Sequence, residues 1–385
     1  MKKFFAKMDL WLLVFIFIYA ILGAIMIYSA SSILTVLSQG KPSTYYFIRQ
    51  LIFVGVGIIF SSIFVLRLPT RKYQVLSYVG IIAIIVALIG LFFYGIEVNG
   101  ARGWYDLDLF SLQPSEFAKS ITILFMASYY NILINKKERN FWLYLIPLAI
   151  VGVILILILK QPDMGGAFIL ALIAGFIFIS LPMNRYVKIR CYKIIGILIA
   201  ILGLVVVFFG DKLVSSYQIS RLTFKEPCTR YQESTGYQVC NGFIAIKNSK
   251  IFGQGFGNST QKYLYLPEAH TDFIFPIICE ELGIIVGALI IIGYGFILYR
   301  ILRIAKRANN IRNSIIAYGT FIYLASHVII NLLGVLALMP LTGVPLPLLS
   351  YGGSFNLNVI FLLFLCERVA IESYDAKVKE RIRNV

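Results

Sequence analysis

An aspartate lies where a long polar segment meets an apolar run, a position that suits proton transfer. Asp272 ends the sequence Tyr265-Leu-Pro-Glu-Ala-His-Thr-Asp272 and is followed by Phe-Ile-Phe. A carboxylate at a membrane edge is partly desolvated, which makes it a better proton acceptor. The alternative is that Thr271 or Asp272 caps the helix that follows. We expect Glu268 and His270 to orient this segment.

Two further segments place charged residues at the beginning of predicted helices. In Gln113-Pro-Ser-Glu116-Phe-Ala-Lys119 the proline starts a helix. Glu116 and Lys119 either pair with each other on one helix face or form a charged mouth, where Lys119 meets an anionic substrate. In Gln161-Pro-Asp163 the carboxylate either complements the helix dipole or provides a second acidic group at that mouth.

Two loops add groups that could bind a phosphorylated ligand. Arg102 is a bidentate partner for phosphate, although an arginine near a tryptophan also anchors proteins at the membrane interface. The segment 340–354 holds three prolines and three glycines, so it cannot be a continuous helix. Such backbone at membrane depth must be buried in protein or line a wet cavity. Ser350 and Tyr351 would offer hydroxyl groups to that cavity.

Apolar helices must position these residues. Hydrophobic residues make up 59% of the chain and charged residues 14%, whereas soluble domains are about a quarter charged. A membrane span needs roughly 20 mostly apolar residues. Such spans are predicted at 10–30, 47–66, 75–95, 114–134, 141–159, 164–182, 191–209, 273–298, 314–336 and 354–373. The predicted fold is an all-α integral membrane protein, a polytopic bundle of about ten transmembrane helices in one domain, residues 1–385.

The charge distribution follows the positive-inside rule if both termini are cytoplasmic. Every second predicted loop is then basic, and the outer loops are balanced, so the whole net charge of +17 lies on the cytoplasmic side. Topology thus explains the charge, which excludes nucleic acid as a partner. All five segments described above fall on the outer side, and this convergence predicts one site there.

The longest outer loop covers residues 210–272, between the seventh and eighth predicted spans. Cys228 and Cys240 lie in it, either joined by a disulfide that closes a short hairpin or as two free thiols. The cysteines and histidines show no metal-ligand spacing. Within the eighth span, at least one of Glu280 and Glu281 is expected to face the bundle interior in an ion pair, because a lipid-facing charge is costly.

Taken together, the motifs resemble the SEDS family (shape, elongation, division and sporulation), which includes FtsW and RodA. The resemblance runs nearly end to end. It rests on Tyr28-Ser-Ala-Ser31, Gly100-Ala-Arg102, Gln113-Pro-Ser-Glu116 with Lys119, Gln161-Pro-Asp163, Pro267-Glu-Ala-His-Thr-Asp272 with Glu280-Glu-Leu-Gly283, and Ser350-Tyr-Gly-Gly-Ser354. The segment 261–270 is closer to FtsW and its sporulation relatives than to RodA.

The resemblance implies a peptidoglycan glycosyltransferase of the bacterial cytoplasmic membrane. It would polymerise lipid II at the outer face and release undecaprenyl pyrophosphate, with Asp272 as catalytic base. Positive charge for the pyrophosphate would come from Arg102, Lys119 and either Arg221 or Lys262. The other expected substrate-binding residues are Glu116, Asp163, Glu268, His270, Ser350 and Tyr351.

The resemblance also bears on cofactors and partners. No cofactor is required by the sequence, although a divalent cation, Mg²⁺ or Mn²⁺, could assist near Asp272. The implied partners are a class B penicillin-binding protein transpeptidase and other divisome or elongasome membrane proteins.

Two other functions remain open at this stage. A lipid II flippase needs polar groups on both sides of the membrane, often within inverted repeats. The sequence has no internal repeat and only basic inner loops, which favours an enzyme that works on one side. A non-catalytic scaffold of the cell-wall synthesis complex would predict that the outer carboxylates are dispensable.

Overall fold

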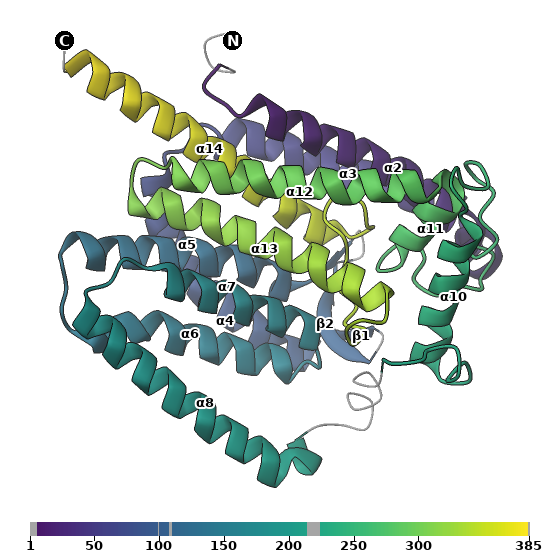
Figure 1. Cartoon of the computed structure of the whole chain (residues 1–385), viewed down its shortest axis with the longest axis horizontal. Helices are drawn as coiled ribbons and strands as arrows, with labels where there is room; N and C mark the ends of the chain where they lie inside the picture. The colour runs from purple at the N-terminus through teal and green to yellow at the C-terminus, as the bar shows by residue number, and fades with distance from the viewer. Residues whose placement is uncertain (1–5, 99, 108–109, 214–223, 384–385) are drawn as a thin grey trace.

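The computed structural model describes residues 6–98, 100–107, 110–213 and 224–383 as a bundle of long helices (Figure 1). The helices that pack into it are α2 (Leu10–Gln39), α3 (Tyr45–Phe60), α4 (Tyr73–Tyr94), α5 (Pro114–Asn135), α6 (Phe141–Leu159), α7 (Met164–Ser180), α8 (Arg185–Leu213), α11 (Ile274–Leu282), α12 (Ile284–Lys306), α13 (Ile311–Val335) and α14 (Gly353–Arg383). The predicted class, a polytopic helical membrane bundle, is confirmed.

The number of spans is less settled than the class. Eight of the described helices are long and apolar enough to cross a membrane, and α7 is a shorter apolar helix. Each predicted range nevertheless contains a helix, and α8 covers the seventh. The count of about ten therefore stays a prediction.

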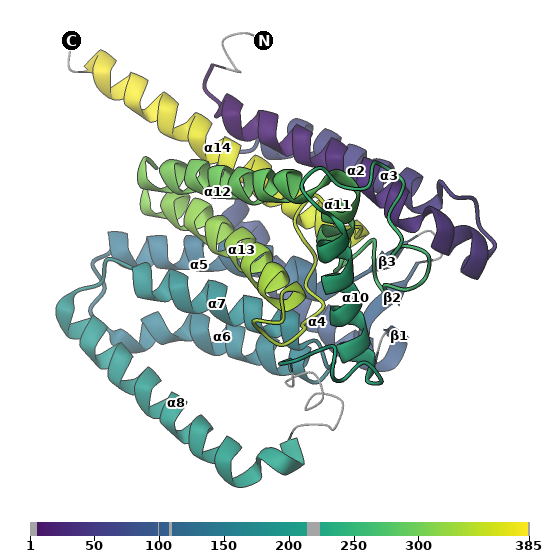
Figure 2. The same ribbon diagram turned by 45° about the vertical axis from the view of Figure 1, so that its right-hand side comes forward.

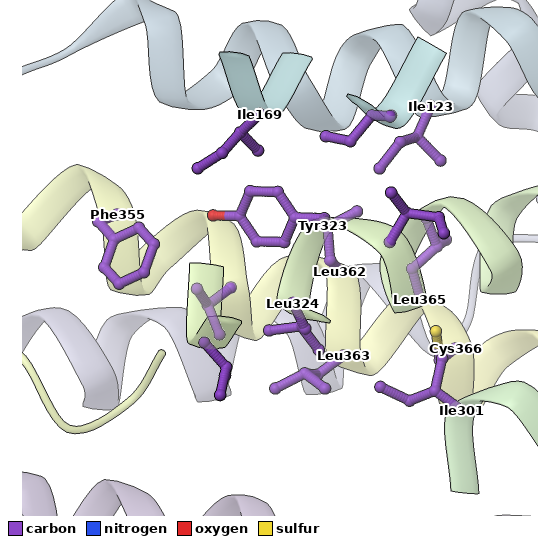
Figure 3. Packing of buried hydrophobic residues seen from close by; sticks show 14 of the residues in the cluster. Ile123, Ile169, Ile301, Tyr323, Leu324, Phe355, Leu362, Leu363, Leu365 and Cys366 are labelled. Carbon is purple, nitrogen blue, oxygen red and sulfur yellow. The ribbon is translucent and has the colours of Figure 1, made fainter. Parts of the chain in front are cut away.

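Three helices form the centre of the bundle. The most apolar stretches of α5, α13 and α14 are 67%, 72% and 78% buried, whereas that of α6 is 28% buried. The central helices are also less apolar, because their polar side chains meet partners inside the protein rather than lipid. Between them, Tyr323 of α13 lies among Ile123, Ile169 and Leu363 (Figure 3).

The eighth predicted span, 273–298, is not one helix, and that prediction was wrong. Gly283 separates α11 from α12 with φ 93° and ψ 163°. A side chain at Gly283 would collide with the carbonyl of Ile251, since the segment 250–255 crosses there. Gln254 donates its backbone N–H to the carbonyl of Glu280 (2.9 Å). At this break, the outer loop therefore packs against the helix bundle and is hydrogen-bonded to it.

The outer loop is anchored by the two buried glutamates of α11. Glu281 pairs with Lys262 at 3.0 Å, as predicted for at least one of the two. Glu280 accepts hydrogen bonds from Thr260 (2.8 Å) and Asn248 (3.2 Å). Each carboxylate is therefore satisfied by groups of the loop, which stabilises the loop's position on the bundle.

Irregular elements gather at the end of the bundle away from the two termini (Figures 1 and 2). They are α10 (Ser234–Asn248) and the antiparallel strands β1 (Ile96–Val98), β2 (Ala101–Asp106) and β3 (Ser111–Leu112). The all-α prediction missed this small sheet, which lies between α4 and α5 in the sequence. Its strand β3 leads directly into α5 and keeps the segment before α5 at this end of the bundle.

A disulfide joins Cys228 and Cys240, the first of the two alternatives. It connects the turns at 227–232 to the middle of α10, so it closes a hairpin made of these turns and the first half of that helix. We expect the double substitution Cys228→Ser/Cys240→Ser to destabilise this hairpin by about 3 kcal/mol, because the unfolded loop regains its entropy. Hydrogen exchange over residues 224–248 would measure the loss. Unchanged protection would contradict it, and exchange in α5 serves as the internal control.

Candidate functional site

A cavity of about 580 Å³ opens among the ends of α3, α5, α7 and α14 and the segments 268–272 and 342–345. Six of the predicted site residues line it: Glu116, Lys119, Asp163, Glu268, Asp272 and Tyr351. These residues come from segments far apart in the sequence, so the expected convergence is observed for this group. The cavity lies at the end of the bundle where β3 and α5 begin.

Asp272 is held through its backbone rather than as a helix cap. The helix α11 begins after Phe273 without a side-chain capping bond, so the capping alternative is not observed. Asn331 of α13 donates from Nδ2 to the carbonyls of Asp272 (2.8 Å) and Val344 (2.7 Å). One buried amide thereby holds the aspartate beside the segment 342–345, which also lines the cavity. Sequence reasoning missed this positioning residue.

Glu116 and Lys119 form a buried ion pair at the start of α5. Lys119 Nζ lies 2.7 Å from Glu116 Oε1, and the side chains are 1% and 6% exposed. The pairing alternative is therefore correct, yet both residues also line the cavity. The hydroxyl of Tyr323 lies 3.5 Å from Glu116 Oε2 and accepts a hydrogen bond from Asn358. Burial and these partners hold two opposite charges at the cavity floor.

Asp163 has both of its predicted roles, at the beginning of a helix and as an acidic group of the cavity. Its Oδ1 accepts a hydrogen bond from the backbone N–H of Gly166 (2.8 Å), so it caps α7. Its Oδ2 accepts one from Ser115 Oγ (3.0 Å), which ties the beginnings of α5 and α7 together. The carboxylate therefore sets the width of the cavity mouth between these helices while it lines the cavity.

Glu268 and His270 precede Asp272 and have different environments. Glu268 lines the cavity and accepts a hydrogen bond from Thr271 Oγ1 (2.6 Å). His270 is buried beside the ring of Tyr46, with centroids 4.5 Å apart, and its carbonyl accepts the N–H of Tyr351 (2.9 Å). Burial lowers the pKa of His270, so the ring is uncharged near neutral pH. It orients the loop, as expected, and does not line the cavity.

Besides His270, three predicted binding residues lie outside the cavity. The exposed Arg102 donates from Nε to the carbonyl of Gly95 (2.8 Å), since the carbonyls at the end of α4 need donors. Lys262 is buried in its ion pair with Glu281. Ser350 is buried and accepts the N–H of Leu346 (2.8 Å), which closes a turn. Arg221, the other residue considered for pyrophosphate, lies outside the described residues.

Two cations that the sequence reasoning missed line the cavity instead. Lys41 and Arg49 flank the ring of Tyr45 at 4.2 and 4.6 Å from its centroid. Both lie on the predicted outer side, where basic residues are not needed for topology. Their position on the outer side is the feature of the sequence from which they could have been predicted as site residues. The lining of the cavity thus holds three cations, Lys41, Arg49 and Lys119, the last of which is paired with Glu116.

A resident metal does not fit the donors present. Within the described ranges, no three His, Cys, Asp or Glu side chains come together in a group that could hold a metal ion. A divalent cation near Asp272 would therefore take most of its ligands from phosphate oxygens of a substrate and from water. The divalent cation stays a prediction.

Gly343 lies next to Asp272 in the lining of the cavity. Its φ is +69°, and a Cβ there would lie 3.2 Å from Asp272 Oδ2. We expect Gly343→Ala to lower activity by roughly tenfold to a hundredfold, because a small displacement of a reacting group is costly. The effect is measured as the rate of the catalysed reaction in the variant relative to that in the unsubstituted protein.

The matched control is Gly257→Ala, whose φ is +81° and whose Cβ would meet nothing within 4 Å. Both substitutions carry a similar backbone penalty of about 1–2 kcal/mol. An equal loss of activity in the two variants would show that backbone strain, and not the approach to Asp272, causes the effect.

Comparisons with known proteins agree with these motifs. The cell cycle protein family of FtsW, RodA and SpoVE matches residues 9–375. A probable peptidoglycan glycosyltransferase FtsW from Bacillus subtilis (strain 168) is 34% identical over 364 residues, which is 92% of this chain and 88% of that protein. Stage V sporulation protein E from the same organism is 33% identical over 353 residues, 90% and 92% of the two chains.

Solved structures support the same fold. A chain of a peptidoglycan synthase complex has a TM-score of 0.74 at 24% identity, covering 95% of this chain and 98% of that one. Thermus thermophilus RodA has a TM-score of 0.67 at 24% identity and the same coverage. Because these relatives are named FtsW or stage V sporulation protein E, the predicted closeness to FtsW and its sporulation relatives is confirmed. The chain belongs to the FtsW, RodA and SpoVE family and is a multi-pass protein of the bacterial cytoplasmic membrane.

Proposed function

We propose that this protein is a peptidoglycan glycosyltransferase that polymerises lipid II at the outer membrane face and releases undecaprenyl pyrophosphate. The observation that carries the proposal is the cavity of about 580 Å³, whose lining includes Asp272, Lys119 and two further cations. The names of the curated relatives support the activity. A carboxylate and several cations in the lining of one cavity suit transfer of a sugar from a diphosphate leaving group.

In the proposed reaction, an acceptor sugar hydroxyl attacks the anomeric carbon of the donor. Asp272 accepts the hydroxyl proton while the bond between the anomeric carbon and the phosphate oxygen breaks. The diphosphate leaves with the electron pair of that bond, and Lys119, Lys41 and Arg49 stabilise its negative charge. General-base catalysis of this type contributes about 10²- to 10⁴-fold to the rate.

The partner most in keeping with this activity is a class B penicillin-binding protein transpeptidase. A structural relative is a chain of a synthase complex that coordinates polymerization and crosslinking. Other divisome or elongasome membrane proteins would contact the same chain. Among the irregular outer elements, the segment 250–265 presents exposed aromatic and aliphatic side chains to such partners.

The test is to add lipid II to the purified protein, with and without the transpeptidase, and to separate glycan strands by length. We expect polymer from the wild-type chain. In sealed vesicles, lipid II translocation without polymer would establish the flippase alternative. Neither polymer nor translocation, in a complex that assembles normally, would favour the scaffold.

A further inference from the structure

A second cavity, of about 400 Å³, lies near the two chain termini. Its walls are residues 6–9, the first turn of α2, the last turns of α12 and the part of α14 around Lys377. In Figure 1 this end of the bundle lies away from α10 and the strands. By the charge distribution, it is the cytoplasmic end. The cavity is therefore separate from the proposed catalytic site.

Ion pairs make the walls of this cavity rigid. Arg300 Nη2 lies 2.6 Å from Asp9 Oδ2, and its Nε lies 2.9 Å from Oδ1, a two-point contact. The N–H of Asp9 donates to Glu367 of α14 (2.8 Å). Lys7 pairs with Asp375 at 2.7 Å. These contacts connect the N-terminal segment to α12 and α14, and they neutralise the charges of Arg300 and Lys7.

Three other cations of the cavity have no carboxylate partner within the described ranges. Arg303 lies in the last turn of α12, Arg307 directly follows that helix, and Lys377 of α14 lines the same cavity. Among the described residues of the lining, the only carboxylate is Asp9, which Arg300 already binds. Three unpaired cations around one hollow create a positive potential that favours an anion with more than one negative oxygen.

The apolar part of the lining identifies the kind of anion. Leu10 and Trp11 open the membrane-facing side and are 50% and 59% exposed. Trp11 packs edge-on against Phe296, two turns before Arg303 on α12, so an apolar surface continues into the membrane from the cationic hollow. Tyr374 closes the other side and is also exposed. Aromatic residues in such positions lie at lipid headgroups.

We propose that this cavity binds the headgroup of an anionic phospholipid of the inner leaflet. The phosphate would lie between Arg303, Arg307 and Lys377, and the acyl chains would follow Leu10 and Trp11 into the bilayer. Basic pockets between helices on the cytoplasmic side suit such headgroups. Because the bound lipid would bridge α2, α12 and α14, it stabilises their cytoplasmic ends.

The test is native mass spectrometry of the purified protein titrated with phosphatidylglycerol, cardiolipin or phosphatidylcholine. We expect the two anionic lipids to bind more tightly than phosphatidylcholine. The variant Arg303→Gln/Arg307→Gln should weaken anionic-lipid binding by roughly 25-fold, since each basic residue near a charged lipid contributes about fivefold. The variant Arg303→Lys/Arg307→Lys should retain most of the binding.

The matched control is Arg381→Gln/Arg383→Gln, which removes the same charge from an exposed part of α14 outside the cavity. Equal weakening in the two Gln variants would overturn the proposal, because diffuse charge would then explain the binding. Equal binding of phosphatidylcholine would also overturn it. Displacement of the lipid by millimolar inorganic phosphate would assign the cavity to a soluble anion instead. Elution at the wild-type volume in size exclusion verifies that each variant is folded.

Discussion

We expect Asp272→Asn to reduce the rate of glycan formation by about 10²- to 10⁴-fold, the usual contribution of a general base. Asparagine keeps the size of the side chain but cannot accept the proton of the acceptor hydroxyl. The backbone contacts of Asp272 should persist, because Asn331 binds its carbonyl and not its carboxylate. Lipid II affinity should therefore change by only a few fold, while kcat falls.

The control for this variant is Asp106→Asn. Asp106 is an exposed carboxylate of β2, at the same end of the bundle, that does not line the cavity. Its substitution should leave kcat within about twofold, which is the range of an ordinary surface change. Initial rates at saturating lipid II give kcat directly. If Asp272→Asn lowers affinity but not kcat, Asp272 binds substrate and another group is the base.

Lys119→Met should have the second large effect, on stability as well as on activity. The substitution leaves Glu116 buried without its ion-pair partner. Breaking a buried pair in this way typically destabilises a protein by about 3–5 kcal/mol. Activity should fall too, because a cation that faces the leaving diphosphate is lost. Thermal unfolding in detergent and lipid II polymerisation report the two losses separately.

The double variant Glu116→Gln/Lys119→Met distinguishes the two roles of the pair. Removing both charges avoids a lone buried carboxylate, so most of the lost stability should return. Activity should not return, since the cation is still absent. Recovery of activity together with stability would mean that Lys119 only neutralises Glu116 and does not contact the substrate.

Residues at helix beginnings were the most predictable part of the site. Glu116 follows Pro114, which starts α5, and Asp163 caps α7, so their position at a helix beginning was fixed by local chemistry. Asp272 was predictable because a carboxylate at a membrane edge is costly unless it has a function. In each case the residue lies within about one helical turn of the helix beginning or membrane edge from which it was predicted.

Long-range partners account for the failures. Arg102 suits phosphate, but the carbonyls at the end of α4 take its donors, and this contact depends on the path of β2. Lys262 was assigned to substrate, whereas the folded loop brings it to Glu281. The break at Gly283 depends on the crossing segment 250–255. None of these contacts has a local signature in the sequence.

Lys41 and Arg49 were missed for a different reason. Arg49 falls at the beginning of the predicted second span and Lys41 in the short loop before it, and neither lies in a motif that suggests a binding site. Only the three-dimensional arrangement shows that this end of α3 faces the segment that carries Asp272. A cation on the outer side of a membrane protein is a useful signal, because topology does not require it.

The most direct test of the central claim is to block the cavity from outside. Thr342 lines it, and the native cysteines are either buried or joined in the disulfide. A membrane-impermeant thiol reagent should lower polymerisation by Thr342→Cys by at least about tenfold, and bound lipid II should slow the labelling. The exposed Phe256→Cys should be labelled without loss of activity. Full activity of labelled Thr342→Cys would place the reaction elsewhere and contradict the proposed site.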